Sequence, residues 1–194
     1  MKQKLIYIFI LLLVFSFCFI QYAGQANSSG AWKTFPINVY IKQNPKSSIA
    51  QRAFNQWQTN SGMNLFKYAQ NEKNADLIFE YKTSNASAKH TACRQGHTHS
   101  KLYQTISSTG QKSDVYIKSA YSYVLLKDCY SGRDADDELL FLMSMHEIGH
   151  ALGLNHSTNK ADIMYPVIKS VNGKLPVLNT TNDVKLLKKL YRQK

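Results

Sequence analysis

Three histidines lie close together in the segment HEIGHALGLNH, residues 146–156. Residues four apart on a helix are turned by about 400°, so His146 and His150 project from one face, about 6 Å apart along the axis. A continued helix would carry His156 to a different face. We therefore expect Gly153 to take a left-handed conformation, to end the helix and to let the chain return His156 to the other two. The spacing predicts that three imidazoles hold one cation.

Three neutral nitrogen ligands suit zinc and leave the fourth tetrahedral position open for water, which is the arrangement of catalytic zinc sites. Glu147 stands one residue away from the histidine face. It is therefore placed beside the water and not on the metal, as a general base should be. We expect one catalytic Zn²⁺, with His146, His150 and His156 as metal ligands and Glu147 as the catalytic residue.

The N-terminus has the pattern of a secretory signal peptide. Two lysines precede an apolar run, Leu5–Ile20, and Gly24 and Ala26 follow it at positions typical of a cleavage site. The alternative is a retained membrane anchor, although sixteen residues fall short of the roughly 20 needed to span a bilayer. The expected organisation is a signal peptide over residues 1–26, a single domain over residues 27–194, and a secreted, extracellular protein.

The chain is strongly basic, with a formal charge of +12 over its 194 residues. Removal of Lys2 and Lys4 with the signal peptide lowers this to +10. Such a charge attracts anionic cell surfaces without specificity, and no helix-turn-helix, basic zipper or zinc-finger spacing predicts specific binding to nucleic acid. With 44% hydrophobic residues the chain can bury a core without a metal, and we expect a monomer.

Hydrophobic periodicity predicts strands and helices in both halves of the chain. Acidic residues crowd the start of the second helix, where they favour the positive end of its dipole over calcium binding. Ser47 or Ser48 is the expected cap of the first helix, and Ser61-Gly62 its end. The expected strands are residues 36–41, 65–68, 75–81 and 113–119, with an edge strand inside 82–110, and the later helices are 136–152 and 181–192.

Two further features concern possible cross-links and metals. Cys93 and Cys129 remain after signal cleavage, and in an oxidising compartment such a pair favours a disulfide. It would close a loop of roughly 37 residues, worth about 3 to 4 kcal/mol. His90, His97 and His99 fall short of a recognised site, so exposed histidines are favoured over an additional structural Zn²⁺ or Ca²⁺, which stays open.

The segment HEIGHALGLNH resembles the metzincin signature of zinc proteases, and Ile163-Met164-Tyr165-Pro166 is similar to the Met-turn of that group. Ser157, directly after the third histidine, is typical of the matrixin branch. The motifs PINVYI, AFNQW and ADLIFEY and the closing helix follow in the order and spacing of a matrixin catalytic domain. The resemblance covers about residues 32–192.

The resemblance implies an α+β, zincin-like catalytic domain of the metzincin type. Its twisted, mainly parallel sheet carries two long helices, and a small C-terminal subdomain holds the Met-turn and a terminal helix. Met164 would form an apolar floor below the metal. Matrixins commonly carry a pro-segment with a cysteine switch, and none is expected here. Ile168 stands where the family usually has an aromatic residue in its specificity pocket.

Two function classes follow. The first is a secreted zinc-dependent endopeptidase for protein or peptide substrates, and the second is an inactive, surface-binding protein on the same scaffold. Glu147 favours the enzyme, because metal binding alone needs no carboxylate there. By resemblance, a strand within Gly96–Ile106 should pair with the substrate. The wall Pro166–Ile168 is apolar, so we expect cleavage on the N-terminal side of apolar residues such as Leu.

Overall fold

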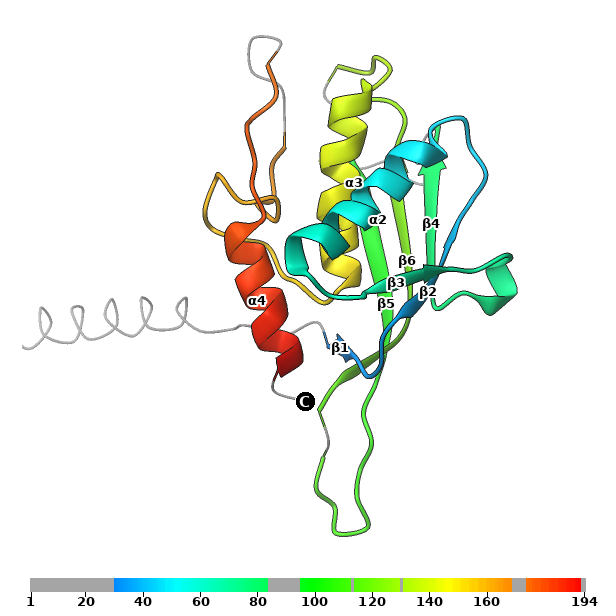
Figure 1. Ribbon diagram of the computed structural model, residues 1–194, viewed down its shortest axis with the longest axis vertical. Coiled ribbons are helices and arrows are strands. Elements are labelled where there is room, and N and C mark those ends of the chain that lie inside the picture. The colour runs from blue at the N-terminus through cyan, green and yellow to red at the C-terminus, as the bar shows by residue number, and fades with distance from the viewer. Residues whose placement is uncertain (1–29, 84–94, 113, 130, 169–173, 193–194) are drawn as a thin grey trace, which may run out of the picture.

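The computed structural model describes residues 30–83, 95–112, 114–129, 131–168 and 174–192. The predicted signal peptide lies outside these ranges. Within them, no helix is both long enough and apolar enough to cross a membrane. Helices α2 and α3 lie against one face of a twisted sheet, and α4 packs beside them next to the short strand β1 (Figure 1). This α+β arrangement is the one expected from the sequence.

The sheet is mainly parallel. Strand β6 pairs in parallel with β1 at residues 116–117 and with β4 at residues 120–125, and β2 and β3 follow β4, also in parallel. Strand β5 pairs antiparallel with β6 along residues 116–124. The fourth expected strand proves to be longer and later than predicted, because β6 is paired on both sides and continues through residues 120–125. The strands are β1 (Ala31–Trp32), β2 (Ile37–Ile41), β3 (Phe66–Tyr68), β4 (Leu77–Lys82), β5 (Gly96–Tyr103) and β6 (Tyr116–Leu125).

Helix α2 (Ser47–Ser61) buries the predicted apolar stripe, with Phe54 and Trp57 fully inaccessible. It ends at Gly62, whose φ of 66° is left-handed, as expected. The predicted serine cap is wrong, because the N-cap position is Lys46 and makes no side-chain cap bond. The Ser47 hydroxyl is instead used in the preceding turn, where it accepts from the Asn44 N–H and donates to the Lys42 carbonyl.

Helix α3 (Asp137–Ala151) begins with a side-chain cap, since the Asp136 carboxylate accepts the Leu139 N–H at 2.7 Å. Asp137 and Glu138 fill its first turn, in agreement with the helix-dipole interpretation. Nearly every later residue of the helix is buried. The Trp57 indole N–H donates to the Met145 carbonyl at 2.9 Å, so α2 contacts α3 at the turn that carries the histidines.

The C-terminal part packs on the end of α3. Helix α4 (Thr181–Arg192) has the predicted bounds and buries Leu187 completely. The Tyr191 hydroxyl donates to the Leu152 carbonyl, and the Trp32 indole N–H donates to the Ala151 carbonyl. Both ends of the described chain thus fix the last turn of α3. A short 3-10 helix, η1 (Glu72–Asn74), precedes β4.

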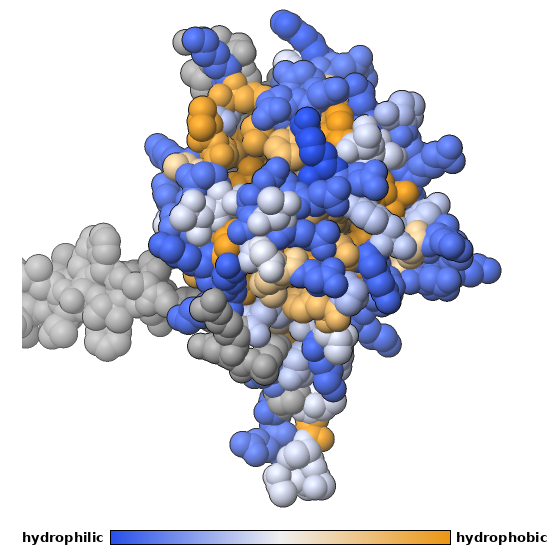
Figure 2. Space-filling view, in the orientation of Figure 1, coloured by the Kyte–Doolittle hydropathy of each residue, from blue (hydrophilic) through white to orange (hydrophobic). Residues whose placement is uncertain are grey.

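The hairpin between β5 and β6 projects well away from the body of the domain (Figure 1). A bridge between Ile106 and Lys112 keeps its two arms together near the tip. Most of the visible surface is hydrophilic, including much of this hairpin (Figure 2). The buried apolar residues form one cluster shared by the sheet, α2 and α3, so the helix that carries His146 and His150 packs against this core.

Candidate active site

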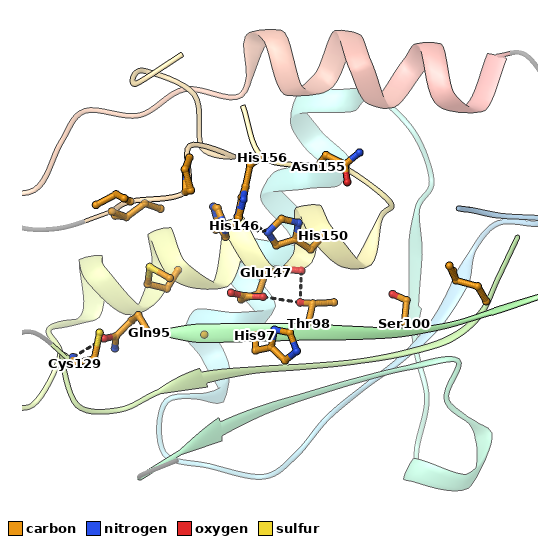
Figure 3. A pocket seen from close by; sticks show the side chains of 16 residues that line it. Gln95, His97, Thr98, Ser100, Cys129, His146, Glu147, His150, Asn155 and His156 are labelled. Atoms are coloured by element: carbon orange, nitrogen blue, oxygen red, sulfur yellow. Dashed lines mark hydrogen bonds between the residues drawn. The ribbon is translucent and has the colours of Figure 1, made fainter. Parts of the chain in front are cut away.

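The three histidines converge at the end of α3 (Figure 3). The Nε2 atom of His150 lies 3.1 Å from that of His146 and 3.1 Å from that of His156. Gly153 has a φ of 91°, so the helix ends as predicted and the chain turns back. A Cβ at Gly153 would lie 2.3 Å from the Gly30 carbonyl oxygen, so this position needs glycine for space as well as for conformation.

Hydrogen bonds fix the tautomer of two of these rings. The Nδ1 atoms of His146 and His150 each lie 2.8 Å from a backbone carbonyl oxygen, of Ile163 and Leu154 respectively. A carbonyl oxygen only accepts, so each Nδ1 carries the proton and each Nε2 presents a lone pair in the neutral ring. Burial, followed by the neighbouring histidines, lowers the pKa of His146 to about 3.

For His150, burial is again the main cause and lowers the pKa to about 4, with His156 and His97 adding to it. Burial also lowers the pKa of His156. At neutral pH the His146 and His150 rings therefore direct two lone pairs at each other with no proton between them. Only a cation placed between them makes this arrangement favourable, so the donor set itself fits a metal ion.

The spacing agrees with zinc. Tetrahedral ligand nitrogens at 2.0 to 2.1 Å from zinc are separated by about 3.3 to 3.4 Å, close to the 3.1 Å between the Nε2 atoms. Among the described residues, His146, His150 and His156 form the one group of three ligand atoms that could hold a metal. The Nδ1 bonds to carbonyl groups orient two of the rings, as is usual for metal-binding histidines.

Glu147 lies beside the histidines and faces β5. Its carboxylate Oε2 accepts the Thr98 hydroxyl at 2.7 Å, and only 3% of the residue is exposed. A Cβ at Gly96 would lie 2.7 Å from Oε1 of Glu147, so glycine leaves the room that this carboxylate occupies. The sequence pattern alone gives Gly96 and Thr98 no role in the site. No local signal marks them, because their contact with Glu147 depends on tertiary pairing.

Met164 packs against helix α3 at Gly149, and its role as an apolar floor below the metal stays a prediction. It is fully buried, and its sulfur occupies the space where a Cβ at Gly149 would be. Glycine at position 149 of the motif therefore lets the turn 163–166 pack directly against α3. This close packing brings the Ile163 carbonyl to the His146 ring.

Asp183 of α4 supports the same turn and was missed by the sequence analysis. Its carboxylate accepts the Ile163 N–H at 3.1 Å, and its other oxygen, Oδ1, is buried with no hydrogen-bond partner among the described residues. Burial and the nearby Asp162 raise the pKa of Asp183 to about 6. The Asp162 carboxylate accepts the Ser157 hydroxyl at 2.7 Å and so ties down the loop that follows His156.

A cleft of about 570 Å³ runs between β5 and the histidines. The predicted apolar wall is present, because Pro166, Val167 and Ile168 all line this cleft. The predicted edge strand is present as well, as β5. Within the described ranges no strand pairs with the outer edge of β5, which remains open along the cleft.

His97 and His99 lie exposed on one face of β5, as expected, and are part of no metal-binding group within the described residues. His90 lies outside those residues. So does Cys93, so the proposed bridge to Cys129 stays a prediction. The Cys129 N–H donates to the Gln95 side chain, which also bonds the carbonyl groups of Leu125 and Lys127. The hydrogen bonds of Gln95 thus link the start of β5 to the segment before α3.

Comparison with known proteins decides the family. The sequence profile described as matrixin matches residues 26–192, most of the chain. The chain belongs to the matrixin family. This confirms the resemblance, the metzincin type of catalytic domain and the α+β fold expected from the sequence. Membership of this family of zinc metalloendopeptidases also implies a catalytic zinc, and the His146, His150 and His156 group of this matrixin domain is able to hold one.

Individual relatives match over shorter stretches. Stromelysin-2 of Rattus norvegicus is 40% identical over 52 residues, 27% of this chain and 11% of the relative. Matrix metalloproteinase-26 of Homo sapiens is 42% identical over 55 residues, 28% of this chain and 21% of the relative. Matrix metalloproteinase-15 of Homo sapiens is 43% identical over 65 residues, which are 32% of this chain and 9% of the relative. The matched parts of this matrixin are a small share of these relatives' length.

Proposed function

We propose that this matrixin is a secreted zinc-dependent endopeptidase that hydrolyses protein or peptide substrates. One observation carries the proposal: three Nε2 atoms converge within 4.8 Å of one another, and the Glu147 carboxylate lines the same cleft. His146, His150 and His156 would hold one Zn²⁺. When bound, zinc would supply a Lewis acid that polarises the scissile carbonyl and makes water a stronger nucleophile.

Glu147 would serve as the general base. It would accept the proton of the attacking water and then pass this proton to the nitrogen of the leaving amine, so that no net proton is gained or lost. Its position on α3, one residue from His146, fixes the distance between the base and the metal site. The Nδ1 bonds of His146 and His150 keep the ring nitrogens available without reorganisation.

The substrate would bind as an extended strand along the open edge of β5. Main-chain pairing with an edge strand holds a peptide of any sequence, so selectivity would come from the cleft wall at Pro166, Val167 and Ile168. Ile168 is only 6% exposed and Met143 lines the same cleft, which makes this region apolar. We therefore propose cleavage on the N-terminal side of medium or large apolar residues such as Leu.

The remaining proposals concern export and covalent structure. Residues 1–26 would be a cleaved signal peptide and residues 27–194 the catalytic domain, acting as a monomer. Its positive charge would add non-specific attraction to anionic surfaces. Cys93 and Cys129 would form a disulfide in the oxidising compartment. Mass spectrometry of exported protein tests both points, since an intact N-terminus or two alkylatable thiols would contradict them.

The decisive experiment compares the wild type with Glu147→Ala on a diverse peptide mixture, with and without a chelator. We expect the wild type to cleave, the chelator to abolish cleavage, and Glu147→Ala to keep zinc and fold while turnover falls by about three orders of magnitude or more. A non-hydrolytic surface-binding protein would show no cleavage in any sample. Near-normal turnover by Glu147→Ala would contradict the proposed mechanism.

A further inference from the structure

We propose that Thr98 is a positioning residue that holds the Glu147 carboxylate in its working orientation, and that Ser122 fixes the direction of the Thr98 hydroxyl. The inference rests on the proposed role of Glu147 as general base. It concerns β5, whose role in the family resemblance was to pair with substrate. In the structure this strand also hydrogen-bonds the proposed base, because Thr98 of β5 donates to the Glu147 carboxylate (Figure 3).

The Thr98 hydroxyl has three polar neighbours. Its Oγ1 lies 2.7 Å from Oε2 of Glu147, 2.9 Å from the Glu147 carbonyl oxygen and 2.9 Å from the Ser122 hydroxyl. A hydroxyl has one proton to donate, and both Glu147 atoms are acceptors when the carboxylate is ionised. The closer acceptor is the carboxylate oxygen, and a charged acceptor forms the stronger bond. The Thr98 proton therefore belongs to Oε2.

Ser122 determines which way this proton points. Ser122 is 0% exposed, and the only hydrogen-bond partner of its hydroxyl among the described residues is the Thr98 hydroxyl. A buried hydroxyl donates where it can, so Ser122 donates to the Thr98 oxygen and leaves the Thr98 proton for Glu147. Thr98 and Ser122 are register partners in the β5–β6 ladder, which holds the two hydroxyls in place.

Gly96 closes the other side of the carboxylate. A Cβ there would lie 2.7 Å from Oε1 and 2.8 Å from Cγ of Glu147. The carboxylate thus has Oε2 bonded to Thr98 while Oε1 lies against the Gly96 backbone. Glutamate loses considerable rotamer freedom when it is fixed, and a base must approach the proton it takes to about 2.6 to 3.2 Å. Because Oε2 is already hydrogen-bonded in the free protein, this side-chain entropy is lost during folding and not when substrate binds.

The first test removes the hydroxyl and keeps the shape. In Thr98→Val we expect kcat to fall about ten- to a hundredfold, with KM within about twofold and zinc content unchanged, because a charge-assisted hydrogen bond is lost. Thr98→Ser should restore most of kcat. Ser122→Ala should lower kcat by only a few-fold, and Ser119→Ala, on the same strand, should leave it unchanged.

The second test separates positioning from stability. Thr98→Val deprives the buried Ser122 hydroxyl of its partner, so Tm should fall. Adding Ser122→Ala removes that unpaired hydroxyl, so the double variant should regain part of the lost Tm without regaining kcat, because Oε2 of Glu147 still lacks its donor. If kcat recovers together with Tm, the role of Thr98 is structural and the inference is wrong. Full kcat in Thr98→Val or in the double variant would also overturn it.

Glu147→Ala, assayed beside these variants, distinguishes the two levels of the argument. An inactive Glu147→Ala with a fully active Thr98→Val would refute the positioning role alone. An active Glu147→Ala would refute the base assignment, and the positioning role with it. Loss of kcat in both, with zinc retained in both, supports both.

Discussion

The two sides of the cleft differ in how far apart their parts lie in the sequence. On one side, α3 and the loop after it supply all three histidines within residues 146–156. On the other side, β5 reaches Glu147 through Thr98, 49 residues earlier in the chain, and the Thr98 hydroxyl is directed by Ser122 from a third segment. A metal-binding motif can be local because helix geometry sets its spacing, whereas the orientation of the base depends on strand register. Single substitutions should therefore affect the two sides differently.

The largest effect is expected on the histidine side. His156→Ala leaves two ligands, so we expect loss of tightly bound zinc and of all measurable turnover. Zinc content by atomic spectroscopy, on protein washed free of loose metal, checks this. His99→Ala is the matched control, since His99 is an exposed histidine of β5 and should affect neither value. Full zinc occupancy in His156→Ala would remove His156 from the ligand set.

A smaller loss is expected on the β5 side. Gly96→Ala places a methyl group 2.7 Å from Oε1 of Glu147 and 2.9 Å from the Tyr123 carbonyl oxygen, so the carboxylate must move. We expect kcat to fall about ten- to a hundredfold, the usual scale for a displaced acid-base group, while bound zinc stays stoichiometric. Loss of zinc in proportion to activity in this variant would contradict the expectation that the β5 side affects the base and not the metal site.

The wall of the cleft should alter selectivity more than rate. Ile168→Ala enlarges the apolar cleft that Ile168 and Met143 both line, so we expect a few-fold shift in preference toward larger apolar residues after the cut. Product sequencing from a peptide library measures it. A dominant preference for Asp, Glu, Lys or Arg at that position, in either protein, would contradict the proposed pocket.

The smallest effect concerns Asp183, which acts on the histidine side through Ile163. Its pKa is raised to about 6 by burial and by Asp162, so its contribution to stability is present below the ordinary carboxyl pKa of about 4 and is lost as pH rises through about 6. Asp183→Asn removes the titration and keeps an acceptor for the Ile163 N–H. Relative to this variant, the wild type should lose stability between pH 4 and pH 7.

Urea unfolding midpoints of both proteins at pH 4.5, 5.5 and 7 measure this difference. The variant cancels the titrations that the two proteins share, including those of the histidines. A difference in midpoint that is constant across the three pH values would show that Asp183 does not titrate as described.

The sequence predicted the parts of the fold that depend on local pattern. The histidine spacing, the left-handed Gly153 and the bounds of α4 all follow from periodicity and capping. Alternation alone predicts this strand at residues 113–119, earlier than β6, because the extension of β6 to Leu125 results from pairing with β4 and β5 on its two sides. Ser47 or Ser48 is the expected cap of α2 because serine favours that position, yet the N-cap residue is Lys46, and the Ser47 hydroxyl is used by the turn at Asn44.

The same division applies to the site. His146, His150, His156 and Glu147 could be chosen from one helical segment. Thr98 looks like any strand threonine until its register with Ser122 and its distance from Glu147 are known. Asp183 likewise reads as an ordinary first-turn acid of α4, where the helix dipole favours it. Its bond to the Ile163 N–H is a contact that only the packed chain reveals.

The short span of the three histidines also bears on folding. Eleven consecutive residues can chelate an ion with little loss of chain entropy, so the unfolded chain retains some affinity for zinc. A metal stabilises a fold only by the difference between its affinities for the two states. Zinc should therefore raise the free energy of unfolding by less than its affinity for the native protein implies. The aromatic and aliphatic core between the sheet and the helices must supply the rest.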